Sequence, residues 1–298
     1  MVKSYSKRTK DEVLNSEISD DCCAAAQLAG MLLFGGSVSE NKIRLVSENS
    51  SITESFCALF GRVFLYKIEP SREKNFYIAE LCNKDIINRV LINFGLTDGG
   101  RLIRRRISPA IIQNDCCKRA FLRGAFLGGA TVVDPSRNYN LEFVTHFRGL
   151  AKDFSELLGT LSFKTGLGER AGNCIIYTKN SETICDILAA MGASNAQMEM
   201  LNVKIEKELR NGMNRSINGE TANYDKAVSA AVKQIRAIET IDCRIGIKNL
   251  PDDLRDLAEL RIKHKDAPLS KLGTLLDPPL TKSGVSHRMK RLMKIAEQ

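Results

Sequence analysis

Hydrophobic positions along residues 20–210 recur with helical spacing in some stretches and with strand spacing in others. In the first half they predict helices at about 20–34, 52–64 and 84–94, and strands at about 36–40, 42–48, 65–69 and 76–81. In the second half they predict helices at about 115–128, 148–160, 182–191 and 196–210, and strands at about 130–133, 139–145, 162–169 and 173–178. Each half therefore has the order αββαββα, which is typical of an α+β unit with an antiparallel sheet.

The two halves also share a direct sequence repeat. Residues 21–38 (DCCAAAQLAGMLLFGGSV) align without a gap with residues 115–132 (DCCKRAFLRGAFLGGATV), at an offset of 94. The identical pairs are Asp21/Asp115, Cys22/Cys116, Cys23/Cys117, Ala26/Ala120, Leu28/Leu122, Gly30/Gly124, Leu33/Leu127, Gly35/Gly129 and Val38/Val132. This agreement in register predicts a duplicated unit of about a hundred residues.

The pattern changes after residue 211. Residues 211–226 are polar and rich in Asn and Gly, which predicts a linker that ends in a helix cap. An amphipathic helix is expected at about 222–241, followed by three short helices within 249–298. The predicted domains are 15–110 and 111–211 for the two halves, 212–248 for the linker and connecting helix, and 249–298 for an all-helical domain with its motif at 269–298.

Charge and composition narrow the classes of function. The net charge of +9 favours a polyanionic partner such as nucleic acid. The longest apolar runs are well short of the roughly 20 residues that a membrane span needs, and the N-terminus lacks the apolar centre of a signal peptide. We therefore expect a cytoplasmic, nucleoid-associated protein that is not bound to a membrane.

The cysteines and histidines suggest no metal or cofactor. The nine cysteines include no CxxC pair, and Cys22–Cys23 and Cys116–Cys117 are vicinal, which is a poor geometry for a structural disulfide. Reduced, mostly buried thiols are expected. His146, His264 and His287 lack metal-ligand spacing. We predict no metal site and no cofactor.

The C-terminal helix has the charge pattern of a DNA-recognition helix. A helix at 284–296 would have Ser283 as its N-cap, and residues 281–294 contain five Lys or Arg and no acid. Such a helix suits the major groove of double-stranded DNA. The residues predicted to meet base edges are Ser286, His287 and Lys290, those predicted to meet phosphates are Lys271, Lys282, Arg288 and Arg291, and Ser283 belongs to the same DNA-binding surface.

The duplicated helices resemble the nine-residue motif of LAGLIDADG homing endonucleases, as LAGMLLFGG at 28–36 and LRGAFLGGA at 122–130. The resemblance implies two helices packed at the centre of a pseudo-twofold saddle, with Gly30 and Gly124 allowing close approach. In that family the eighth motif position is an acid that holds the catalytic metals. Gly35 and Gly129 occupy those positions here, so we predict no catalytic residues and no enzymatic activity.

Longer segments resemble the WhiA family of sporulation regulators. They are RAFLRGAFLGGATVVDPSRNYNLEFV at 119–144, NRSINGETANYDKAVSAAVKQI at 214–235 and LSKLGTLLDPPLTKSGVSHRMKRLMKIAE at 269–297. The resemblance implies a degenerate LAGLIDADG-like domain joined to a helix-turn-helix domain. It also implies a DNA-binding transcriptional regulator of cell division, chromosome segregation and, where the lineage sporulates, sporulation.

Two other hypotheses stay open at this point. One is an active or conditional endonuclease. The other is an interaction module whose saddle binds a sigma factor, RNA polymerase or another regulator. A basic cluster between the halves, formed by Arg101, Arg104, Arg105 and Arg106, is a candidate DNA contact or a solvated face.

Overall fold

The structure is a computed structural model that describes residues 3–18, 20–97 and 103–298, and it divides into a first unit, Met1–Lys207, and a second unit, Glu208–Gln298. The helices of the first unit are α1 (Tyr5–Leu14), α2 (Asp21–Gly35), α3 (Ser50–Phe64), α4 (Lys84–Asn93), η1 (Pro109–Ile111), α5 (Asp115–Gly129), α6 (Arg148–Thr160) and α7 (Ser181–Ala190). Its strands are β1 (Gly36–Val38), β2 (Ile43–Ser47), β3 (Ser71–Glu73), β4 (Phe76–Leu81), β5 (Ala130–Val132), β6 (Leu141–Thr145), β7 (Gly166–Arg170) and β8 (Asn173–Thr178). Helix α8 (Ser194–Ile245) begins in the first unit, and η2 (Ile247–Asn249), α9 (Asp252–Lys263), α10 (Leu269–Leu275) and α11 (Lys282–Glu297) complete the second.

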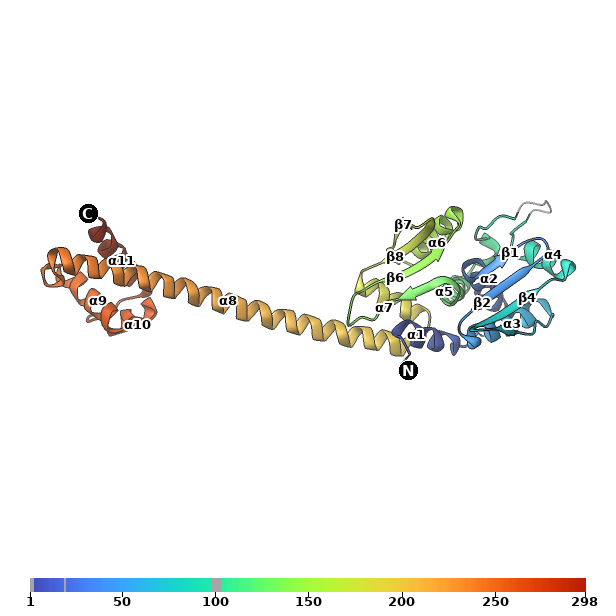
Figure 1. Ribbon diagram of the computed structural model, residues 1–298, viewed down its shortest axis with the longest axis horizontal. Coiled ribbons are helices and arrows are strands. Elements are labelled where there is room, and N and C mark those ends of the chain that lie inside the picture. The colour runs from blue at the N-terminus through green and yellow to red at the C-terminus, as the bar shows by residue number, and fades with distance from the viewer. Residues whose placement is uncertain (1–2, 19, 98–102) are drawn as a thin grey trace. The chain divides into compact units, whose positions relative to one another are not determined.

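The first unit contains two copies of one motif. Each copy has a four-stranded antiparallel sheet, in the orders β1-β2-β4-β3 and β5-β6-β8-β7. Helices α2 and α5 lie side by side between the two sheets (Figure 1). The predicted fold class, a duplicated αββαββα saddle followed by an all-α domain, is confirmed.

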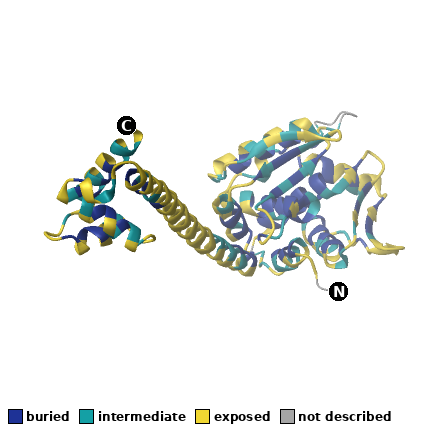
Figure 2. Cartoon of the chain, turned by 60° about the vertical axis from the view of Figure 1, so that its left-hand side comes forward, coloured by how far each residue is buried: buried dark blue, intermediate teal, exposed yellow. Residues whose placement is uncertain are grey.

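The core of the first unit follows from the hydrophobic patterns. Helix α2 is apolar all round, and eleven of its fifteen residues are buried. Strand β6 alternates as predicted, with Leu141, Phe143 and Thr145 buried. The rings of Phe34, Phe143 and Phe154 pack at centroid distances of 4.8–6.3 Å and join α2, β6 and α6. Figure 2 shows the buried residues gathered along the central helices and the strands.

The last helix of each half, α4 or α7, begins with an asparagine N-cap. The Asn83 side chain accepts hydrogen bonds from the backbone amides of Asp85 and Ile86 at the start of α4. The Asn180 side chain accepts one from the amide of Thr183 at the start of α7. An Asn at this position satisfies amides that have no partner inside the helix, so local sequence sets both starts.

The structure differs from the predicted elements at three places along the chain. The strand predicted at 65–69 is absent because Leu65 leaves α3 with φ +54° and Ile68 packs into the core, and the edge strand β3 begins at Ser71 instead. Helix α1 was not predicted at all. The predicted linker at 211–226 is helical, and the helices predicted at 196–210 and 222–241 are both part of α8. Gly212 and Gly219 each weaken a helix by about 1 kcal/mol, whereas proline, the strong helix breaker, does not occur in α8.

Candidate nucleic-acid interface

Helices α9, α10 and α11 surround the apolar core of the second unit. Leu257, Leu272, Val285, Met289 and Leu292 are all buried in this core. The apolar face of α11 is therefore the face that packs against its own domain, and the opposite basic face is left for solvent or a ligand.

The turn between α10 and α11 depends on a glycine. The Leu280 amide donates a hydrogen bond of 2.9 Å to the Gly273 carbonyl. A Cβ atom at Gly273 would lie 2.2 Å from the Leu280 carbonyl oxygen, which is far too close for any side chain. Gly273 thus allows the two helices of the helix-turn-helix to approach each other at this turn.

Helix α11 begins one residue after Thr281, whose hydroxyl accepts a hydrogen bond from the Gly284 amide at 3.3 Å. The prediction that Ser283 is the N-cap is therefore wrong. Thr281 lies three residues before the amide that needs a partner, which is the usual N-cap spacing. Ser283 lies in the first turn instead and is exposed.

Most of the predicted DNA-binding residues lie on one surface. Lys282, Ser283, Ser286, His287 and Lys290 follow the exposed face of the first turns of α11; only Ser286 among them is half-buried. Lys271 is exposed on α10. With Lys294 further along α11, this surface has basic side chains over about three helical turns. Their roles toward bases and phosphates stay predictions.

Arg288 and Arg291 have partners inside the protein. Arg291 forms an ion pair with the Asp253 carboxylate at 2.9 Å. Arg288 donates to the Asp253 carbonyl oxygen at 3.2 Å, and its Nε lies 3.8 Å from the same carboxylate. Asp253 belongs to the first turn of α9, so these two arginines tie α11 to α9.

Replacement of Asp253 tests whether Arg288 and Arg291 serve to pack α11 against α9 or to bind DNA. We expect Asp253→Ala to lower the free energy of unfolding by no more than about 1 kcal/mol, because the ion pairs are half-exposed. We expect DNA affinity to rise a few-fold, because two guanidinium groups become available to phosphates. Chemical denaturation and fluorescence anisotropy measure the two effects. Asp256→Ala removes the same charge from an exposed position of α9 and is the control. An affinity equal to wild type would assign Arg288 and Arg291 to packing.

Arg261 is a structural residue that the sequence analysis missed. It is 2% exposed, and its Nη1 donates to the Ala267 carbonyl at 2.7 Å and approaches those of His264 and Lys265 at 3.5 and 3.4 Å. Burial lowers the pKa of its guanidinium. It holds the turn that leads from α9 into α10.

In the first unit, α2 and α5 touch through their backbones. A Cβ at Gly30 would lie 2.4 Å from the Phe121 carbonyl oxygen, and one at Gly124 would lie 2.0 Å from the Gln27 carbonyl oxygen. Since Phe121 is the repeat equivalent of Gln27, the two contacts are related by the pseudo-twofold axis. The expected role of these glycines in close approach is confirmed.

The close packing of α2 and α5 also fills the space around Gly35 and Gly129, the two positions that hold acids in the resembled nucleases. A Cβ at Gly35 would lie 2.7 Å from the Cα of Gly128, and one at Gly129 would lie 2.7 Å from the Phe34 carbonyl oxygen. The two positions thus lack a carboxylate and also lack the space for one.

Lys10 lies beside the C-terminal end of α5, near Gly129. The Lys10 ammonium of α1 donates to the Leu127 carbonyl at 3.4 Å and lies 5.9 Å from the centroid of the Phe126 ring. Burial lowers its pKa to about 8. A cation in this position satisfies a carbonyl at the helix end and repels divalent metal ions.

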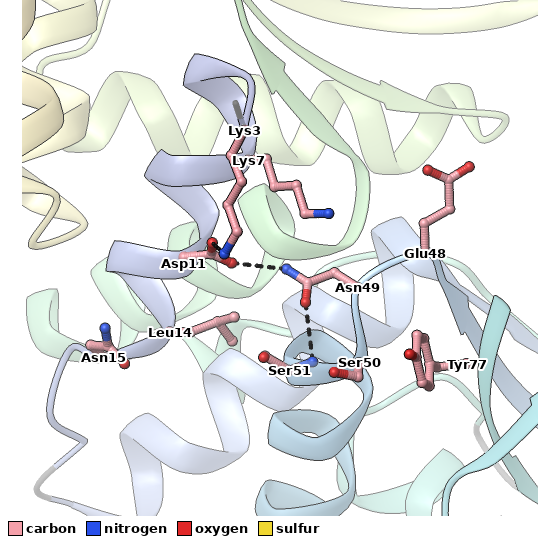
Figure 3. Close-up of a pocket in the computed structure, with 10 residues that line it drawn as sticks. All are labelled: Lys3, Lys7, Asp11, Leu14, Asn15, Glu48, Asn49, Ser50, Ser51 and Tyr77. Atoms are coloured by element: carbon pink, nitrogen blue, oxygen red, sulfur yellow. Dashed lines mark hydrogen bonds and ion pairs between the residues drawn. The ribbon is translucent and has the colours of Figure 1, made fainter. Parts of the chain in front are cut away.

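Helix α1 also lines a polar groove of about 390 Å³ against the start of α3. Asp11 accepts hydrogen bonds from Lys3 at 2.7 Å and from Asn49 at 3.0 Å, and Asn49 in turn caps α3 at Ser51 (Figure 3). None of the predicted DNA-binding residues lines this groove.

The basic cluster between the halves is largely engaged within the first unit. Arg105 donates to the Val38 carbonyl at 2.6 Å and stacks on Phe147 at 4.5 Å. Arg106 forms two hydrogen bonds of 2.6 Å with Asp153. Arg101 lies outside the described residues. The described contacts indicate that the cluster joins the halves, and DNA contact by it stays a prediction.

Basic residues on the outward faces of the two sheets are paired with acids. Arg44 lies within 3.5 Å of Glu73 and 3.4 Å of Glu80, and Arg170 lies 3.0 Å from Glu142. These pairs reduce the positive potential that a phosphate backbone would require. The charge on the saddle is thus less suited to DNA than that of α11.

The cysteines differ from expectation. All nine are free, but three are buried, two half-buried and four exposed, so the prediction of mostly buried thiols is wrong. Cys22, Cys23, Cys116 and Cys117 lie together at the starts of α2 and α5. The sequence showed the two vicinal pairs, but not that α2 and α5 would bring them together.

Within residues 3–18, 20–97 and 103–298, no helix is both long and apolar enough to span a membrane.

Comparisons with known proteins agree with both units. The model of the WhiA LAGLIDADG-like domain matches residues 118–210, and that of the WhiA C-terminal HTH domain matches residues 213–296. The probable cell division protein WhiA of Alkaliphilus metalliredigens is 36% identical over 310 residues, covering 99% of this chain and 98% of that protein. Its counterpart from Alkaliphilus oremlandii is 37% identical over 317 residues, covering 98% and 97%. The crystal structure of full-length DUF199/WhiA from Thermatoga maritima has a TM-score of 0.60 at 24% identity, covering 99% of this chain and 98% of that chain.

Proposed function

Because the chain belongs to the WhiA family, we propose that it is a DNA-binding regulator of transcription that acts in cell division and has no nuclease activity. The observation that carries the proposal is the exposed basic face of α11, which starts at a capped helix N-terminus. Double-stranded DNA is the partner whose phosphates and major-groove edges such a face can meet together. Chromosome segregation and sporulation are the wider processes we assign to it, with a nucleoid location in the cytoplasm.

The first unit supports a scaffold role. The backbone contacts at Gly35 and Gly129, together with the half-buried Lys10, oppose metal binding at the end of the helices that carries the catalytic acids in the resembled nucleases. The paired charges on the sheets favour a second function for this unit, contact with a protein of the transcription machinery such as a sigma factor or RNA polymerase. A pull-down of those proteins with full-length chain, compared with the Arg44→Glu variant, tests that second function.

DNA selection from a pool of genomic fragments tests the main proposal. Full-length protein is expected to retain a reproducible subset of fragments and to leave them uncut with or without Mg²⁺. Retention without sequence preference would refute a regulator that reads sequence, and cleavage that requires Mg²⁺ would restore the endonuclease hypothesis.

A double variant with Gly35→Asp and Gly129→Asp extends the same assay. We expect no Mg²⁺-dependent cleavage, and a loss of about 1–3 kcal/mol of stability per site from overpacking against the neighbouring helix. Gel analysis of plasmid nicking and urea unfolding measure the two effects. Nicking by this variant would show that only the acids are missing and that the helices can separate to admit them.

A further inference from the structure

Four cysteine side chains converge where α2 and α5 begin. Cys22 and Cys23 lie in the first turn of α2, and Cys116 and Cys117 lie in the first turn of α5. All four Sγ atoms lie within 4.8 Å of one another, and those of Cys116 and Cys117 are 3.9 Å apart. Because the helices are repeat equivalents packed side by side, their first turns bring two vicinal pairs to one point.

These spacings suit a single tetrahedral metal ion. Four thiolates at about 2.3 Å from Zn²⁺ have sulfurs about 3.8 Å from one another. The thiols therefore need to move by about 1 Å or less to close on one ion. Two flanking carboxylates are engaged elsewhere, since Asp21 pairs with Arg62 and Asp115 with Lys118, both at 2.8 Å. Among the described residues, the ligand atoms that lie within 4.8 Å of one another here are the four sulfurs, which favours a soft or borderline cation over Mg²⁺ or Ca²⁺.

The surroundings of the four thiols favour the thiolate form in some respects and the protonated form in others. Two helix N-termini direct their partial positive charge at the cluster. Arg123 of α5 interacts electrostatically with Cys23, and its buried Nε has no hydrogen-bond partner. Burial raises the pKa of Cys23 to about 12 and that of Cys117 to about 11. The exposed Cys22 and Cys116 provide an entry path for the ion.

We propose that Cys22, Cys23, Cys116 and Cys117 bind one Zn²⁺ ion in a closed structural site that joins the two halves of the saddle. The ion links helices whose backbones already touch at Gly30 and Gly124, and it fixes their N-terminal ends. Binding releases the protons of the coordinating thiols, as zinc binding to cysteine does in general.

Metal analysis of full-length protein purified under reducing conditions tests the proposal. We expect about one zinc per chain, as a four-thiolate site requires. The metal-free protein obtained with a chelator should bind Co²⁺ with the intense thiolate-to-cobalt absorption of a tetrahedral site and should unfold at a lower temperature than the zinc form. This measurement needs no variant and so does not depend on how substitutions affect folding.

Two double Cys→Ser variants test whether the four clustered cysteines are the ones that bind the ion. Cys22→Ser with Cys116→Ser alters only exposed thiols and should lose the zinc. Cys82→Ser with Cys243→Ser alters two other exposed thiols and should keep it. A full equivalent of zinc in the first variant, iron in place of zinc, wild-type protein that binds neither Zn²⁺ nor Co²⁺, or disulfides among the four cysteines in the purified protein would each overturn the proposal.

Discussion

Full-length protein with Lys282→Glu and Lys290→Glu is expected to bind its selected DNA fragments about 100-fold more weakly than wild type. Both side chains are exposed on the face of α11 opposite the buried stripe of Val285, Met289 and Leu292. A lost phosphate or base contact costs about 1–3 kcal/mol, and reversed charge adds repulsion from the DNA backbone. The loss should be measured by fluorescence anisotropy over a range of salt concentrations.

The control for this variant changes the same amount of charge elsewhere. Lys84→Glu with Lys164→Glu reverses two exposed lysines of the first unit and should change affinity little. The slope of log affinity against log salt should fall by about 1 for each lost phosphate contact in the α11 variant only. Equal losses in both variants would mean that general charge, and not α11, governs binding. A wild-type affinity in the α11 variant would contradict the proposed interface.

Gly124→Ala is expected to cost about 3 kcal/mol of stability or more. The new Cβ would lie 2.0 Å from the Gln27 carbonyl oxygen and 2.9 Å from the Met31 nitrogen. Both neighbours are backbone atoms of α2, so rotation of a side chain cannot relieve the clash, and the two helices must separate. Urea unfolding followed by circular dichroism measures the loss.

Gly159→Ala is the matched control for this substitution. It replaces a helical glycine of α6 around which a Cβ would meet no atom within 4 Å. Its stability should stay equal or rise by up to about 1 kcal/mol, because alanine favours helix. If Gly124→Ala were as stable as this control, the contact between α2 and α5 would not be the close one described.

The close packing of α2 and α5 connects the fold to the proposed function. Helices that touch through glycine backbones give the first unit a rigid centre, but they leave no volume for carboxylates at Gly35 and Gly129. The glycines at the two acid positions and the approach of the two helices therefore support the same proposal, a scaffold without a metal-activated nucleophile.

Some features could be predicted from sequence because they depend on short-range patterns. The αββαββα order and the three C-terminal helices follow from the spacing of hydrophobic residues along the chain. The repeat follows from identical residues at a constant offset of 94. The Asn83 and Asn180 caps are equally local, although the sequence analysis did not single them out. Strand β3 could not be placed, because edge strands carry little hydrophobic signal and all three of its residues are exposed. Helix α1 went unpredicted because only Tyr5, Thr9 and Val13 are buried among its polar residues.

The sequence by itself determined the duplicated order of elements, the missing acids and the basic face of the last helix, since each depends on residue type and spacing along one segment. Only the tertiary structure decided which distant residues meet. It placed Asp253 against Arg288 and Arg291, closed the space at Gly35 and Gly129, and gathered four cysteines from two helices. These contacts join residues that are from 35 to 95 positions apart in the chain, and such contacts depend on how helices pack, which no local pattern encodes.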